Sequence, residues 1–175
     1  MSVCLLDVNV LIALAWPSHI LHERVIRWFG KQTGRAWATC PFAQTTFVRI
    51  LANPAFSLAS LSPSNAVELL ERNVAHPGHQ FCPANITFKK ALEIARTRLT
   101  GHQQASDVYL LGLAIHNKGV LATCDSGLAA RGFGLHGGPS SVGRIDRAAF
   151  LIYIISVIGH SMDQIVRPTE TPSIR

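Results

Sequence analysis

Short apolar runs alternate with longer amphipathic patterns along the first 130 residues, and this alternation constrains the fold more than any other feature. A short apolar run suits a strand that is buried on both faces of a sheet. Apolar residues at helical spacing in the segments between the runs suit helices that pack on that sheet. The pattern therefore predicts an α/β fold in three layers, α/β/α, with a central and mostly parallel sheet.

The expected elements follow from this pattern together with capping and turn residues. Strands are expected at residues 3–6, 36–39, 79–82 and 120–123. Helices are expected at residues 9–15, 19–31, 42–52, 62–75, 87–99 and 103–117, with either Asn85 or Thr87 as the cap of the fifth. Within them, Ile20 falls near the apolar face of the second helix, and Val67 is spaced with Leu70 and Val74 for the core.

The length of 175 residues suits one compact domain with a core of its own. Apolar residues make up 48% of the chain and charged residues 15%, which argues against disorder. We expect residues 1–135 to form the main domain and residues 136–175 a C-terminal extension. The apolar segment 148–159 is too short to span a bilayer. It is expected to be a last strand, to pack on the domain as a helix, or to form part of a dimer contact.

The net charge of +6 favours polyanionic partners, nucleic acid first. Basic residues that suit an RNA track, or equally a solvated face, are Arg24, Arg27, Lys31, Arg49, Lys89, Lys90, Arg96 and Arg98. Four separated cysteines without a CxxC pair indicate buried, reduced thiols. No signal peptide or membrane-length apolar run is found, so we expect a cytoplasmic protein without membrane contact.

Three of the ten acidic residues fall at positions that the predicted fold would bring to one edge of the sheet. Asp7 and Asp125 each follow a strand, and Asp107 lies in the first turn of a helix that leads into a strand. In a parallel sheet the carboxyl ends of the strands and the following helix starts share one edge, where ligand sites form. Each acid has a simpler interpretation as a helix cap or dipole partner. Taken together, they predict a convergent acidic site.

Converging carboxylates repel by about 4 kcal/mol per pair at 4 Å for an effective dielectric constant near 20. A hard divalent cation such as Mg²⁺ or Mn²⁺ removes this penalty and prefers oxygen ligands. Such an ion promotes attack of water on a phosphodiester. A basic chain with this site is therefore a nuclease candidate.

Other kinds of site are less well supported. The chain has no GxSxG nucleophile elbow and no phosphate loop. The histidine pairs His19/His22 and His76/His79 have ligand-compatible spacing, but both lie near turns. The tryptophans at positions 16, 28 and 37 suit core or dimer contacts better than base-stacking platforms.

Four segments together resemble the PIN domain family, specifically the VapC-type toxins of bacterial toxin–antitoxin pairs. The segments are LLDVNVLIALAW, HERVIRWF, WATCPFAQTTFVRILANPAF and ASDVYLLGLAIHNKGVLATCDSGLA. The resemblance implies a magnesium- or manganese-dependent endoribonuclease with a PIN-like fold. It also implies a cognate antitoxin and a homodimer.

The resemblance extends to single residues. Asp7, Asp107 and Asp125 match acids of the family and would bind the metal, while Asn9 and Thr123 match polar residues beside them. The family's remaining acid, a glutamate, falls at Gln44, which is a departure. A neutral amide weakens metal affinity and water activation. The alternative is therefore an attenuated or inactive module that binds RNA or an antitoxin without cleaving.

Overall fold

The computed structural model describes residues 3–31, 36–56, 60–96, 99, 101–124 and 153–154. Its elements in chain order are β1 (Cys4–Leu6), α1 (Val8–Ala15), α2 (His22–Gly30), β2 (Trp37–Thr39), α3 (Pro41–Leu51), α4 (Pro63–Val74), β3 (His79–Phe81), α5 (Phe88–Ala95), the 3-10 helix η1 (His102–Gln104), α6 (Ala105–His116), β4 (Val120–Thr123) and β5 (Tyr153–Ile154).

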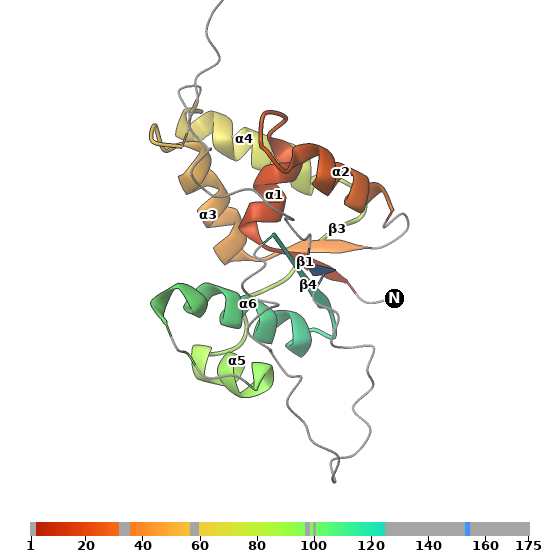
Figure 1. Ribbon diagram of the computed structural model, residues 1–175, viewed down its shortest axis with the longest axis vertical. Helices are drawn as coiled ribbons and strands as arrows, with labels where there is room; N and C mark the ends of the chain where they lie inside the picture. Colours follow the sequence, from red (N-terminus) through yellow and green to blue (C-terminus); the bar gives the residue numbers. More distant parts are fainter. Residues whose placement is uncertain are drawn as a thin grey trace, which may run out of the picture.

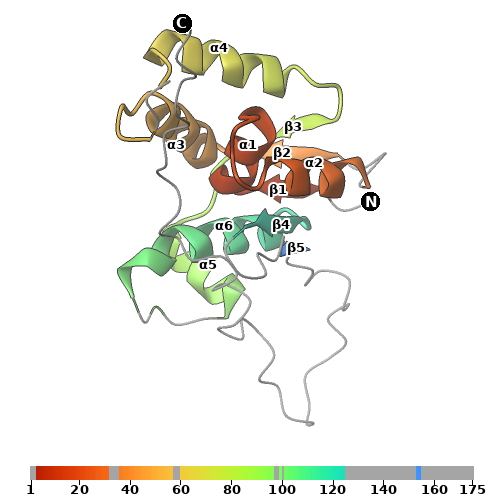
Figure 2. The same ribbon diagram turned by 45° about the horizontal axis from the view of Figure 1, so that its top comes forward.

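The strands form one sheet in the order β3-β2-β1-β4-β5, and every pairing is parallel. Helices α1–α4 cover one face of the sheet, and α5 and α6 cover the other (Figure 1, Figure 2). The expectation of a three-layer α/β/α fold is confirmed. Since the strands run in parallel, all their carboxyl ends lie at one edge.

Alternating strand residues divide the core into two clusters. Leu6, Trp37 and Ala122 belong to the cluster under α1–α4. Leu5 and Leu121 belong to the cluster under α5 and α6. The continuous apolar runs in the sequence reflect this burial on both faces.

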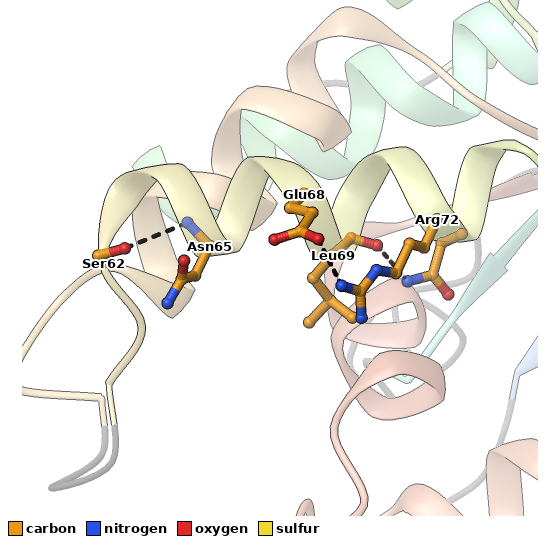
Figure 3. Close-up of polar contacts among 6 residues, drawn as sticks. Ser62, Asn65, Glu68, Leu69 and Arg72 are labelled. Atoms are coloured by element: carbon orange, nitrogen blue, oxygen red, sulfur yellow. Dashed lines mark hydrogen bonds and ion pairs between the residues drawn. The ribbon is translucent and has the colours of Figure 1, made fainter.

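Helix α4 shows how local capping fixes the position of an element (Figure 3). The Ser62 side chain accepts a hydrogen bond from the backbone N–H of Asn65 at 3.2 Å, and Pro63 opens the helix. Arg72 forms an ion pair with Glu68 on the exposed surface. Ser62 and Pro63 therefore set the start of the helix that the sequence predicts at residues 62–75.

Two predicted core positions were wrong. Ile20 is 68% exposed because it lies in the turns before α2, which begins at His22 rather than at His19. Val67 is 42% exposed because α4 packs inward through Ala66 and Leu70. Helical periodicity identifies an apolar stripe, but it does not fix which residue of the stripe contacts the core.

The helix expected at 87–99 also ends early. α5 stops at Ala95, and Arg96 caps it with a left-handed backbone (φ 50°). The expected helix at 103–117 is divided between η1 and α6.

The predicted division at residue 135 and the interpretations of segment 148–159 fall mostly outside the described residues. Of that segment, the structure describes β5, which pairs in parallel with β4 at the edge of the sheet. No helix in the described part of the chain has the length and continuous apolar character needed to cross a membrane.

Candidate functional site

Asp7 lies at the carboxyl edge, between β1 and α1, and is 5% exposed. Its Oδ1 accepts a hydrogen bond from the backbone N–H of Val8 at 2.6 Å. Its Oδ2 accepts one from the hydroxyl of Thr123 at 3.0 Å. Its own backbone N–H donates to the carbonyl of Ala122 at 2.9 Å. The carboxylate thus caps α1 and also contacts the end of β4.

Thr123 is the last residue of β4 and is 1% exposed. The parallel register pairs Leu6 with Ala122, so the next residues on the two strands, Asp7 and Thr123, lie side by side. A hydrogen bond to an ionised carboxylate is stronger than one between neutral groups. It fixes the orientation of Asp7 from a position 116 residues further along the chain.

Asp107 lies in the first turn of α6 and is partly exposed. α6 leads through a short connection into β4, so the end of α6 lies near the amino edge of the sheet and its start near the carboxyl edge. This topology places the first turn of α6 at the edge that carries Asp7. Asp125 follows Cys124 directly and lies outside the described residues.

The two predicted polar neighbours differ in their surroundings. Asn9 is exposed in the first turn of α1. Gln44 is half-buried in α3, and its Nε2 donates to the hydroxyl of Thr39 at 2.9 Å. Thr39 in turn lies 2.8 Å from Nε2 of His79.

Thr39 and His79 were missed by the sequence analysis. A signal was present, because the tripeptide Ala-Thr-Cys occurs at residues 38–40 and 122–124, so that β2 and β4 both end in threonine followed by cysteine. The match predicts equivalent hydroxyls at the ends of two strands. It does not reveal His79, whose contact depends on the register between β2 and β3.

Thiols follow three of the strands at the same edge, at Cys40, Cys82 and Cys124, and all three are buried. Burial raises the pKa of Cys124 to about 12, with the negative charge of Asp7 acting in the same direction and Arg24 against it. Burial also raises the pKa of Cys40; backbone hydrogen bonds at the start of α3 oppose this, and the charge of Asp7 adds a smaller increase. The field of Asp7 therefore reaches the ends of both flanking strands, while the thiols stay protonated at neutral pH.

Three of the four paired histidines make contacts within nearby turns or helices, and the fourth, His79, contacts Thr39. Nδ1 of His22 lies 2.7 Å from the carbonyl of Ala13, and Nδ1 of His19 accepts the backbone N–H of Leu21. Nδ1 of His76 accepts the backbone N–H of Gly78 at 3.0 Å. These roles favour turn stabilisation over metal binding.

The donor set fits a hard cation in its chemistry. Asp7 and Asp107 offer carboxylate oxygens, which Mg²⁺ and Mn²⁺ prefer over the sulfur of the neighbouring protonated thiols. Among the described residues, no group of three or more His, Cys, Asp or Glu side chains is placed to hold a metal ion. The predicted third ligand, Asp125, lies outside that part of the chain.

The fold and this edge define an α/β protein with a buried aspartate directly after the central strand of a parallel sheet. Comparison with known families makes the assignment specific, since the model of the PIN domain matches residues 4–134. The chain belongs to the PIN domain family and is of the VapC type.

Individual relatives support this assignment. Ribonuclease VapC39 of Mycobacterium tuberculosis is 36% identical over 125 residues, which cover 71% of this chain and 90% of that protein. Ribonuclease VapC44 of the same organism is 37% identical over 125 residues, which cover 71% and 87%.

A solved structure of VapBC2 from Rickettsia felis, bound to a DNA fragment from its promoter, shares the fold. The TM-score is 0.52 at 10% sequence identity, and the match covers 73% of this chain and 92% of that one.

Proposed function

We propose that this protein is a metal-dependent endoribonuclease, the toxin of a toxin–antitoxin pair. The observation that carries the proposal is the buried Asp7, which accepts a hydrogen bond from Thr123 at the carboxyl edge of the sheet. Asp107, in the first turn of α6, supports it from the same edge. The curated relatives of VapC type are named ribonucleases, which supports RNA as the substrate.

In this proposal Asp7, Asp107 and Asp125 hold Mg²⁺ or Mn²⁺. The ion, when bound, lowers the pKa of a water ligand and stabilises charge on the phosphate. The chain itself contributes orientation. The Val8 N–H and the Thr123 hydroxyl each donate to one oxygen of Asp7, which fixes the orientation of the carboxylate. Gln44 and Asn9 complete the polar surroundings.

Positive charge would hold the RNA. Exposed basic side chains in the described part of the chain include Arg27, Lys31, Arg49, Lys89 and Arg96. Contacts between such residues and phosphates are sequence-independent and salt-dependent. Affinity for single-stranded RNA is therefore expected to fall steeply as salt concentration rises.

The test is single-turnover cleavage of a labelled RNA mixture with and without Mn²⁺. The wild-type protein should cleave with the ion and stop after chelation. Asp7→Ala should lose cleavage, whereas Glu71→Gln, which removes an exposed acid on α4, should retain it. Cleavage that continues unchanged in Asp7→Ala would contradict the proposal.

We also propose a protein antitoxin, a homodimer and a cytoplasmic location. The solved VapBC2 structure, whose fold this chain shares, supports the antitoxin. A short open reading frame beside the gene should encode it, and its product should abolish cleavage on mixing. Sedimentation of the purified chain alone tests the homodimer.

A second candidate is a module that binds RNA or an antitoxin without cleaving, and Gln44 at the usual glutamate position favours it. RNA would then bind and stay intact with every metal. Restoring the acid with Gln44→Glu should produce cleavage if the site has simply lost a carboxylate.

A further inference from the structure

Gln44, Thr39 and His79 form a continuous chain of hydrogen bonds beside the candidate site. Nε2 of Gln44 lies 2.9 Å from the Thr39 hydroxyl, which lies 2.8 Å from Nε2 of His79. Thr39 is fully buried at the end of β2, one residue before the N-cap of α3, the helix that carries Gln44. Within the described part of the chain, the hydroxyl contacts no other side-chain partner.

The positions of the protons in this chain follow from what each group can do. In one arrangement the Gln44 amide donates to Thr39, and Thr39 donates to an unprotonated Nε2 of His79. In the reverse arrangement His79 donates to Thr39, and Thr39 donates to the Gln44 carbonyl oxygen. Each arrangement satisfies the buried hydroxyl, and the two differ in which nitrogen of His79 carries the proton.

The surroundings of His79 favour the first arrangement. Burial lowers the pKa of His79, and the nearby His76 lowers it further, so the ring is neutral near pH 7. The backbone at Val74 acts in the opposite direction. Because the Gln44 amide donates to Thr39, the hydroxyl proton is directed to Nε2 of His79, so Nε2 accepts and the proton of the neutral ring lies on Nδ1. The Trp37 ring packs edge-on against His79 at 4.7 Å and holds its plane.

We infer that Thr39 and His79 are positioning residues that hold the Gln44 amide in one orientation, with its nitrogen turned inward and its carbonyl oxygen free for the site. The role in RNA cleavage rests on the proposed function, whereas the orientation does not. The Gln44 oxygen then accepts a hydrogen bond from the attacking water and orients it without removing its proton. Glutamine at position 44 thus fits the observed hydrogen bonds, whereas a carboxylate there requires the protons of Thr39 and His79 to reverse.

The inference changes what Gln44→Glu should do. A carboxylate cannot donate, so Thr39 must donate to it. His79 must then place a proton on Nε2 to satisfy Thr39. The substitution should move the His79 proton from Nδ1 to Nε2. It should also raise the pKa of His79, because the new carboxylate lies on the other side of the Thr39 hydroxyl.

The experiment is nitrogen-15 NMR of the histidine rings in the full chain, which distinguishes the two neutral forms. In the wild type, His79 should be protonated on Nδ1. Thr39→Val should shift the ring toward the Nε2 form, and Gln44→Glu should do so with a raised pKa. Thr45→Val is the matched control, since Thr45 is exposed on the next residue of α3 and should leave His79 unchanged.

RNA cleavage is measured on the same variants. Thr39→Val and Gln44→Ala should lower single-turnover cleavage by a similar factor, about 10–100-fold, which is usual for residues that orient a site. Gln44→Glu should give no gain. If the wild type fails to cleave RNA while the NMR results hold, the proposed function is wrong and the orientation stands.

Two results would overturn the inference. One is a wild-type His79 protonated on Nε2, which selects the reverse arrangement. The other is a Gln44→Glu variant that gains cleavage while the His79 spectrum stays unchanged, which marks Gln44 as a lost catalytic acid. Thermal unfolding of each variant separates these outcomes from misfolding. Gln44→Asn is a milder test of the amide, because it keeps the amide group on a side chain that is one methylene shorter.

Discussion

Replacing Gly112 by alanine tests how α5 is held against α6. A Cβ atom at this position would lie 2.5 Å from the carbonyl oxygen of Ala91, 2.6 Å from its Cα and 2.7 Å from its Cβ. Two of these three atoms belong to the backbone of α5, so no side-chain rotation relieves the contact. The helices can accommodate the methyl group only by moving apart.

Two opposing effects set the magnitude. Overpacking of a close contact costs about 1–3 kcal/mol, and the backbone contacts place this case near the upper end. Alanine in place of a helical glycine returns about 1 kcal/mol of helix stability. The net expectation is a loss of about 2 kcal/mol in the free energy of unfolding. For a chain of this size, that corresponds to a fall in Tm of roughly 4–8 °C.

Urea denaturation measures the change, and Gly30→Ala is the matched control. Gly30 ends α2, and a Cβ atom there would meet nothing within 4 Å, so alanine should raise stability by up to about 1 kcal/mol. The double variant Ala91→Gly/Gly112→Ala should recover little, because the oxygen and Cα of residue 91 remain in place. Stability at or above wild type in Gly112→Ala would refute the reasoning.

Three further predictions concern the site and its surroundings. Thr123→Val should lower single-turnover RNA cleavage about 10–100-fold, since Thr123 orients Asp7, and should cost about 1.5–3 kcal/mol in urea denaturation; unchanged values would show that the contact orients nothing. Cys124 should resist alkylation by iodoacetamide at pH 8 in the native state, because its pKa is raised to about 12, and should react once the chain is unfolded in urea. The free energy of unfolding should be highest above pH 6.5 and decline as pH falls below it, because the folded state lowers the pKa of His19 and His79 and so binds fewer protons than the unfolded chain. Urea denaturation at pH 7.5 and 5.5 measures this difference in the free energy of unfolding. The difference should be smaller in a His79→Asn variant.

The sequence predicted those features that depend on local pattern or on the general rules of parallel sheets. The alternation of elements was enough for the fold class. Asp7 follows one parallel strand and Thr123 ends another, so the rules of parallel sheets are enough to put both residues at the same edge. Their contact also depends on β1 and β4 being neighbours in register, which the sequence did not predict.

Features that depend on register or on a single backbone angle were not predictable in this way. His79 reaches Thr39 across 40 residues, through the alignment of β3 with β2. The left-handed backbone of Arg96 ends α5 within a stretch whose sequence favours a longer helix. Gly112 lies within α6, and its missing side chain permits the close approach of Ala91, which depends on how α5 packs on α6.

The same distinction bears on Gln44. Read from the sequence alone, the residue is a departure from an acidic pattern and suggests loss of activity. In the structure the side-chain nitrogen of Gln44 donates to the buried hydroxyl of Thr39, and that hydroxyl also contacts His79. Thr39 is buried, and its hydroxyl is satisfied by the Gln44 amide and the His79 ring. We therefore expect the amide to be the functional group at position 44, and cleavage by the wild type with no gain in Gln44→Glu is the result that this account requires.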